Sequence, residues 1–429
     1  MLYSSNYSFI LAVFVNYILG ILFLRFVLKN RQISVFYIYS FFSSIYLLLI
    51  LFTHIELIKD PFIDFFVHND SSRSFYTSIM GYVLPCSWTD ILPFTVFNPY
   101  FADYPFAAYL WSTIGKIGMS VGIEDLRLLM RLPSALVGSL TVSISAMYFL
   151  HKKMLNRNII KYSILLGLCT YLYITSAIMS RDVFLTFFMT LAIYFYMINN
   201  TKYIPFIVFI GFIALGFRTI NGLCIMLIAI IPILHKIYNK SKFFSILLFL
   251  LLALIIFGNS LVFSEQIQLY QTYQLHNATI NKGGLFYYFY TLPFPFDKLS
   301  MAVYMLLQPL PMTFYVLGDG NTWLNLPEII SPYIIVYMVG VLLYLLKGKN
   351  GFDERIKILT IILILIYIMI ISGSPDIRRA FFVMPGLYMI FCTNKEICPK
   401  MTRKTIKRRI WIFLICINIF FLFYTMKYI

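Results

Sequence analysis

The sequence predicts an all-α integral membrane protein with about 12 transmembrane helices and two long extracytoplasmic loops that carry interfacial helices. Two observations lead to this fold class. Of the 429 residues, 61% are hydrophobic and only 12% are charged, which lies far outside the composition of a soluble domain. Apolar runs long enough to cross a ~30 Å hydrocarbon core recur along the chain. Because lipid offers no partner to the backbone, each run is expected to be a helix.

These apolar runs follow one another along the whole chain. The first run has no basic residue before it and no small-residue cleavage site after it, so we expect it to be retained as a span. The sequence shows no internal repeat, and residues 1–429 are predicted to form a single polytopic domain. The predicted spans are 8–28, 33–53, 132–150, 162–178, 183–199, 203–217, 219–234, 243–262, 331–346, 358–372, 380–393 and 410–427.

The basic residues gather in alternate loops. With the loop 25–31 in the cytoplasm, 22 of the 34 Lys and Arg residues fall in cytoplasmic loops, as the positive-inside rule requires. Only three of the 17 acidic residues do so. The net charge of +17 therefore reflects orientation in the membrane, and we expect no nucleic-acid partner. This orientation places the loops 54–131 and 263–330 on the outer side.

The two long outer loops are expected to carry structure. The first, 54–131, is too long for a structureless connection, and its segment 106–118 reads as an interfacial helix that contains Trp111. The second, 263–330, is rich in Tyr, Phe, Gln and Asn and contains the proline-interrupted apolar piece 301–317. Counting that piece as a span would invert the charge bias of everything after it, so we expect it to be interfacial or re-entrant.

Three carboxylates lie at the predicted outer boundary of the membrane, where ionisable groups are costly and are therefore candidates for function. Asp70 follows the second span, Asp103 precedes the interfacial helix, and Asp182 opens a span in the sequence Ser180-Arg181-Asp182. Structural roles are also open for two of them. Asp70 suits the N-cap of a loop helix, and Asp182 suits a helix cap paired with its neighbour Arg181.

Basic side chains on the same predicted side offer a site for phosphate. Arg218, Arg378 and Arg379 are the strongest candidates, and Arg181 and Lys282 accompany them. Each of these alone could simply extend its charged end to the membrane surface. Because arginine binds phosphate with two parallel hydrogen bonds, such a cluster beside a carboxylate suits a reaction whose leaving group is a lipid-linked phosphate. No metal-ligand spacing is visible, and a divalent cation is left open.

The order of these motifs resembles that of the GT-C glycosyltransferases, and within them the protein mannosyltransferases and bacterial lipid A aminoarabinose transferases. The resemblance covers roughly residues 60–225 and extends to 373–390. It is carried by Asp70 with the following Tyr76, by Asp103-Tyr104-Pro105 ahead of an aromatic helix, by Arg131-Leu132-Pro133, and by Arg181-Asp182 at the opening of a span.

This resemblance implies an enzyme of the bacterial cytoplasmic membrane with a periplasmic active site. Its donor would be a polyprenyl-phosphate sugar, and its acceptor a polysaccharide or a lipid-linked molecule. By carry-over, Asp70 is the catalytic base, Asp103 the acidic residue before the family's proline, and Asp182 the second-turn aspartate. Arg378 or Arg379 matches the basic position ahead of a late helix. The chain departs from the family at Asn69-Asp70-Ser71, where an acidic pair is common.

The expected reaction is an inverting single displacement. Asp70 would accept the proton of an acceptor hydroxyl as that oxygen attacks the anomeric carbon, while the outer cations stabilise the departing phosphate. Two alternatives remain open. An O-antigen or capsular polysaccharide polymerase would join lipid-linked oligosaccharides and would also use outer arginines. A lipid-linked-sugar flippase or other transporter would need ionisable groups along a path through the bilayer, and hardly any lie within the predicted spans.

Overall fold

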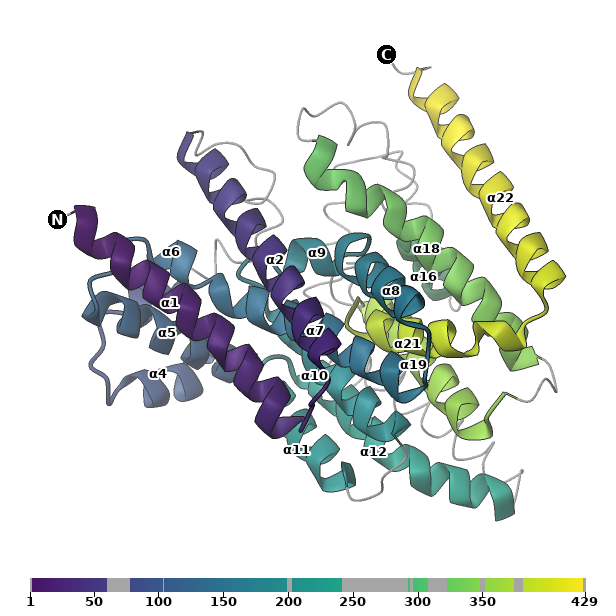
Figure 1. Ribbon diagram of the computed structural model, residues 1–429, viewed down its shortest axis with the longest axis horizontal. Helices are drawn as coiled ribbons and strands as arrows, with labels where there is room; N and C mark the ends of the chain where they lie inside the picture. The colour runs from purple at the N-terminus through teal and green to yellow at the C-terminus, as the bar shows by residue number, and fades with distance from the viewer. Residues whose placement is uncertain are drawn as a thin grey trace. The chain divides into compact units, whose positions relative to one another are not determined.

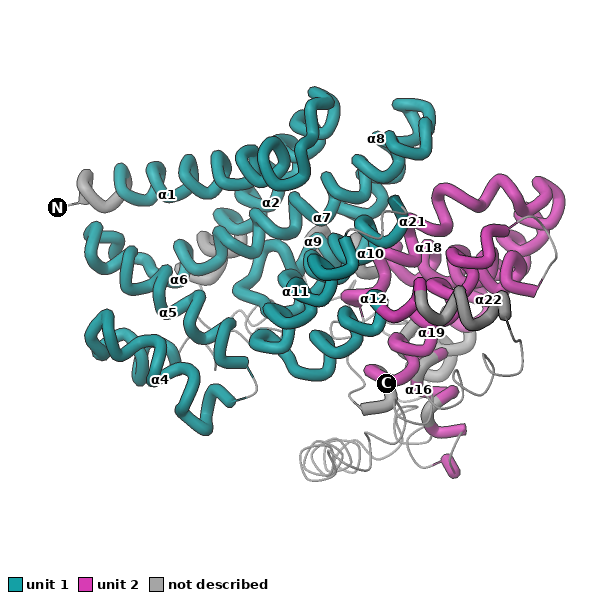
Figure 2. Tube along the Cα trace, turned by 90° about the horizontal axis from the view of Figure 1, so that it is seen from below, with its two compact units in different colours: residues 1–229 teal, residues 230–429 magenta. Residues whose placement is uncertain are grey.

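The chain folds into helices throughout the part that the computed structural model describes. Those ranges contain no strand, which confirms the all-α prediction. Contacts within the chain divide it into two compact units, Met1–Ala229 and Ile230–Ile429 (Figure 2). The structure describes residues 2–59, 78–102, 104–198, 203–240, 292–293, 296–307, 322–347, 352–373 and 381–426.

Among the described residues, four helices are long and apolar enough to cross a bilayer. Two shorter apolar helices, Ile204–Leu215 and Thr219–Pro232, accompany them. The count of about 12 spans and the placement of the loops therefore stay predictions. The four segments are Tyr7–Val27, Ile33–Phe52, Leu126–His151 and Ile330–Lys347.

The N-terminal helix presents large apolar side chains on its outer surface. It consists of α1 (Leu2–Leu22) and the short π-helix η1 (Phe23–Val27) that continues it. The side chains of Ile10, Leu11 and Phe14 are all more than half exposed. Exposed apolar surface of this extent is rare on a soluble monomer, and it is typical of a helix that faces lipid.

The central helix of the first unit is α7 (Leu132–His151), of whose residues 16 are buried. It packs against α1, α2 (Ile33–Lys59), α8 (Asn156–Leu168) and α10 (Arg181–Met197) (Figure 1). Small residues allow this close packing. A Cβ atom on Gly138, for example, would lie 2.0 Å from the hydroxyl oxygen of Ser176. The hydroxyls of Ser139, Ser143 and Ser145 in α7 donate to carbonyl oxygens one turn earlier, so each buried donor has a partner within the helix.

One predicted span is interrupted in the structure. Residues 162–178 do not form one helix, because α8 ends at Leu168 and the short α9 (Leu172–Thr175) follows a bend. Thr170 lies in the bend, where its hydroxyl donates to the carbonyl of Leu166 and accepts from the backbone N–H of Leu172. A side chain that replaces backbone partners in this way commonly ends or bends a helix.

The segment between α2 and α7 carries helical structure of its own, as predicted. The predicted helix 106–118 lies within the observed helix α5 (Pro105–Ser120). Trp111 is fully buried in the first unit, however, and does not lie on an exposed face. The helix α2 also runs to Lys59, so the connection begins later than residue 54. The other described elements here are η2 (Ile79–Val83), α4 (Ile91–Phe97), η3 (Pro99–Phe101) and α6 (Leu126–Leu129).

The first unit is completed by α11 (Ile204–Leu215) and by the start of α12 (Thr219–Lys240). Gly216, Phe217 and Arg218 connect these two helices in a tight turn. The two helices approach each other closely at this turn, since a Cβ atom on Gly222 would lie only 2.4 Å from the backbone nitrogen of Leu215.

The described part of the second unit is built around α21 (Met384–Asn394), whose residues 384–392 are all buried. It contacts α18 (Thr322–Lys347) and α19 (Glu354–Gly373), and α22 (Lys400–Met426) packs along α18. Of the predicted re-entrant piece 301–317, only the part within α16 (Phe296–Leu307) is described. The remaining elements are η5 (Phe381–Val383) and η6 (Lys395–Ile397).

Candidate functional site

The helix α10 begins at a capped turn that holds the first functional carboxylate. Ser180 is the N-cap residue, and its hydroxyl oxygen accepts a hydrogen bond of 3.1 Å from the backbone N–H of Asp182. A serine in this position supplies a partner to a helix-start N–H that has none within the helix. Asp182 itself lies in the first turn, where a negative charge interacts favourably with the helix dipole. The sequence Ser180-Arg181-Asp182 therefore fixes the start of the helix and the position of the carboxylate together.

Asp182 is joined to a second element by an ion pair. Arg218, which directly precedes α12, donates from Nη1 to the Oδ1 atom of Asp182 at 2.8 Å. The two side chains are only 18% and 11% exposed, respectively. A charge-assisted hydrogen bond with little access to water is stronger than the same bond at a surface. The pair connects residues 36 positions apart and so fixes the start of α12 against the start of α10.

The neighbouring cation, Arg181, is held by an aromatic ring. Its guanidinium carbon lies 4.1 Å from the ring centroid of Tyr104, well inside the range of a cation–π interaction. Tyr104 is the residue that precedes α5, and Pro105 occupies the first turn of that helix. Proline is favoured there because its missing N–H would have no helical partner.

Four helices begin in the same region of the first unit. The backbone N–H of Phe106, in the first turn of α5, donates to the carbonyl of Gly216 at 2.9 Å, two residues before Arg218. The backbone N–H of Ser180 contacts the hydroxyl of Ser134, in the first turn of α7, at 3.5 Å. With the ion pair and the cation–π contact, these bonds bring together the first residues of α5, α7, α10 and α12. Each helix start carries partial positive charge, so their convergence favours an anion.

A third guanidinium belongs to this group of helix starts. Arg131 precedes α7 and is 1% exposed, so its charge is withdrawn from water. Arginine is almost never fully buried unless its charge is matched by polar or charged groups. Among the described residues, the four helix starts thus contribute Arg131, Arg181 and Arg218 as cations and Asp182 as a carboxylate.

An aromatic cluster supports the ion pair from the protein interior. The rings of Phe184 and Phe217 stack at 5.2 Å, and Trp111 meets Phe184 edge to face at 5.4 Å. The indole N–H of Trp111 donates to the carbonyl of Met130, the residue before Arg131, at 3.0 Å. Phe217 directly precedes Arg218 and Phe184 follows Asp182 by two residues, so this packing restrains both ends of the pair. Each such aromatic contact contributes about 0.5–1.5 kcal/mol beyond the area it buries.

The structure brings together three of the eight residues that the sequence nominated. Asp182, Arg181 and Arg218 meet at the convergent helix starts. The other nominated residues lie outside the described residues, and their roles stay predictions. They are Asp70, Asp103, Lys282, Arg378 and Arg379.

Sequence reasoning missed two supporting residues. In the sequence, Tyr104 stands out only as part of a motif, although an aromatic ring directly after a nominated carboxylate, Asp103, is a signal for a cation partner. The sequence places Trp111 at the membrane interface, whereas the structure buries it completely in the first unit. The signal for Trp111 was available in the helical spacing of Ala107, Ala108, Trp111 and Gly115, which places small residues on the same face of α5 as the large ring.

Within the described ranges, no three His, Cys, Asp or Glu side chains gather where they could hold a metal ion. The divalent cation that the sequence left open therefore gains no candidate ligands from these residues. No family model, curated protein or solved structure matches the chain. The function of the site must accordingly be inferred from its own residues.

Proposed function

We propose that the chain is a membrane glycosyltransferase that takes a sugar from a polyprenyl-phosphate donor, and that the convergent helix starts of the first unit hold the donor phosphate. The observation that carries this proposal is the Arg218–Asp182 ion pair of 2.8 Å with the guanidinium of Arg181 on the adjacent residue. Arginines preorganised at helix starts are a common arrangement for phosphate groups.

Each described residue has a distinct part in this proposal. Arg218 would stabilise the negative charge that develops on the phosphate as it leaves, because its guanidinium is already oriented by Asp182. Arg181 would add its positive charge beside the phosphate, and the ring of Tyr104 would hold its guanidinium in place. Asp182 would act as a positioning residue, since its Oδ1 atom already accepts from Arg218.

The chemical step is a single displacement in which the acceptor oxygen forms a bond to the anomeric carbon. The bond between that carbon and the phosphate oxygen breaks, and its electron pair remains on the phosphate. The acceptor proton passes to a carboxylate base, for which Asp70 is the sequence-based candidate. Transfer of this kind inverts the anomeric configuration and places the new glycosidic bond on the side of the membrane where the helix starts lie.

Transfer assays on membranes test the proposal. Membranes that contain the wild-type chain or the Arg218→Gln variant are incubated with radiolabelled polyprenyl-phosphate sugars and candidate acceptor glycans. The Arg218→Gln variant loses one preorganised hydrogen-bond donor to the leaving phosphate, and we expect its turnover to fall about 100-fold. Arg218→Lys keeps the charge but loses the planar fork, so we expect an intermediate rate. Arg157→Gln removes an exposed cation from α8 and is the matched control, with turnover unchanged.

The second candidate is an O-antigen or capsular polysaccharide polymerase. The described site favours this candidate because it contains arginines, while its carboxylate, Asp182, is already held in an ion pair. A polymerase would tolerate Asp70→Asn but would lose activity in Arg218→Gln. Transfer that is lost in both variants supports the transferase. A change in polymer length with no transfer from any monosaccharide donor would instead assign the site to a polymerase.

A further inference from the structure

The helix α22 of the second unit begins with a dense group of cations. Its first ten residues contain six basic side chains. One of them, Arg403, forms two parallel hydrogen bonds of 2.9 and 2.7 Å to Glu396. Within the described part of the chain, the others form no ion pair. These five are Lys400, Lys404, Lys407, Arg408 and Arg409, and all of them are exposed.

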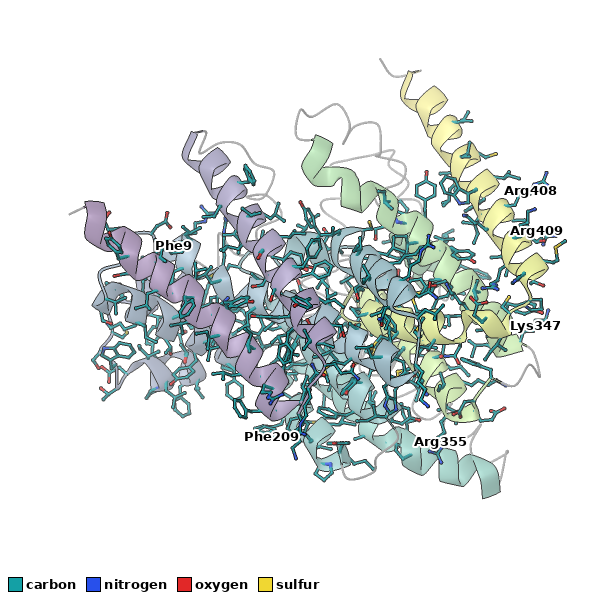
Figure 3. The ribbon with its side chains drawn as sticks, in the orientation of Figure 1. Phe9, Phe209, Lys347, Arg355, Arg408 and Arg409 are labelled. Carbon is teal, nitrogen blue, oxygen red and sulfur yellow. The ribbon has the colours of Figure 1, made fainter. Side chains whose placement is uncertain are left out.

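One side of α22 is occupied by α18. A Cβ atom on Gly340 of α18 would lie 3.2 Å from both Ile406 and Ile410, so the helices are in close contact there. Leu414 is fully buried one turn later. These residues are spaced by four and define the packed face of α22. Figure 3 shows Arg408 and Arg409 extending from α22 on the side that is turned away from α18.

The exposed face of α22 changes character along the helix. With 3.6 residues per turn, Lys400, Lys404, Lys407 and Arg408 fall within one arc of the helix surface. Trp411 and Ile415 continue the same arc, and both are 46% exposed. Four cations are thus followed along the same face by a tryptophan and then by aliphatic side chains. The ring of Trp411 also contacts Tyr333 at 5.0 Å, which fixes its orientation.

This order of side chains matches the profile of a membrane from one headgroup layer into the hydrocarbon core. From Lys400 to Arg409 the helix rises about 14 Å, and the apolar part that follows rises about 25 Å, most of the hydrocarbon thickness. Tryptophan is enriched at the boundary between these two layers. Clusters of four to eight basic residues beside a transmembrane helix attract anionic lipid phosphates.

We propose that the exposed basic face of α22, formed by Lys400, Lys404, Lys407 and Arg408, binds the phosphate headgroups of anionic membrane lipids. The ligand is a bilayer lipid in the leaflet that surrounds the start of α22. This binding is independent of the transfer reaction proposed for the first unit. Since Arg403 is already engaged by Glu396, it orients the helix and is not part of the lipid site.

Fluorescence of Trp411 reports on this site directly. The full chain and its Trp411→Phe variant are reconstituted in phosphatidylcholine vesicles that contain brominated phosphatidylglycerol or the same fraction of brominated phosphatidylcholine. The difference between the two chains isolates quenching of Trp411. We expect the anionic lipid to associate at least about fivefold more strongly than the zwitterionic lipid. The combined Lys404→Gln, Lys407→Gln and Arg408→Gln variant is expected to lose this preference.

A matched control removes the same charge elsewhere. Lys152→Gln, Lys153→Gln and Arg157→Gln alter exposed cations of the first unit, and the lipid preference at Trp411 should persist. Raising the salt concentration on the wild-type chain should weaken the preference without any substitution, which tests the proposal even if the triple variant does not fold. Equal quenching by the two lipids, or an unchanged preference in a folded triple variant, would overturn it. Loss of the preference on adding inorganic phosphate at constant ionic strength would show a soluble-anion site instead.

Discussion

Each unit of the molecule contains an arginine–carboxylate ion pair, and the two pairs differ in almost every respect except chemistry. In the first unit, Arg218 and Asp182 make a single hydrogen bond of 2.8 Å between residues 36 positions apart. In the second, Arg403 and Glu396 make two bonds of 2.9 and 2.7 Å between residues seven positions apart. Bond geometry alone would rank the second pair as the stronger.

The surroundings reverse that ranking. The Glu396 side chain is 66% exposed, so water and salt screen its interaction with Arg403. Asp182 is only 11% exposed and lies beside the stacked rings of Phe184 and Phe217. An ion pair that joins two helix starts in a region poor in water constrains tertiary structure. An exposed pair between near neighbours constrains mainly the connection from η6 to α22. The number of elements that a pair connects, and its access to water, therefore indicate its importance better than its bond count.

The largest predicted effect comes from the turn that positions Arg218. In Gly216→Ala, the new Cβ atom would lie 2.2 Å from Phe106 at the start of α5, close to the root of that side chain, so the helix start must move. We expect a loss of about 2–3 kcal/mol in the free energy of unfolding, measured by thermal unfolding in detergent. Gly81→Ala is the control, because nothing lies within 4 Å of its new Cβ atom. Equal losses in the two variants would show that the contact with Phe106 is not the cause.

The second prediction tests the interhelical pair itself. Asp182→Asn leaves the guanidinium of Arg218 partly buried without its counter-charge, and we expect unfolding free energy to fall by about 1–2 kcal/mol after allowance for the residual exposure. The double variant with Arg218→Gln should be less destabilised than the sum of the single variants, because the second change removes the uncompensated charge. Strictly additive losses in this cycle would mean that the two side chains do not interact energetically.

A smaller effect is expected at the cation–π contact. Tyr104→Leu removes the ring that lies 4.1 Å from the guanidinium of Arg181 and should cost about 1 kcal/mol. Tyr104→Phe keeps the ring and should retain most of that stability. Thermal unfolding of the two variants side by side measures the difference. A phenylalanine variant as unstable as the leucine variant would show that the hydroxyl, and not the ring face, is what matters.

The smallest effect belongs to the exposed pair, and it depends on pH. Hydrogen bonding from Arg403 lowers the pKa of Glu396 below its ordinary value of 4.5. A lowered pKa in the folded state means that the stabilisation is complete at neutral pH and is lost as the pH falls below that ordinary value. Glu396→Gln should therefore reduce stability by about 0.5 kcal/mol or less at neutral pH, and by nothing in acid. A difference between the variant and the wild type that persists in acid would contradict this assignment.

The starts of several helices could be predicted from the sequence, because the length of an apolar run is a local property of the chain. The starts of α2, α7 and α10 lie within two residues of the predicted spans, since a run of apolar residues forms a helix in lipid whatever its neighbours are. The break between α8 and α9 did not follow from hydropathy. It depends on the hydroxyl of Thr170, a polar interaction within an otherwise apolar run.

The sequence by itself determined that the described chain is helical and apolar enough to span a membrane, and it nominated Asp182, Arg181 and Arg218 as ionisable groups at helix boundaries. Only the tertiary structure decided that these three share one location with Tyr104, because contacts between residues 36 or more positions apart depend on how helices pack. It also decided that Trp111 lies inside, since the burial of an aromatic ring depends on which neighbouring helix covers it.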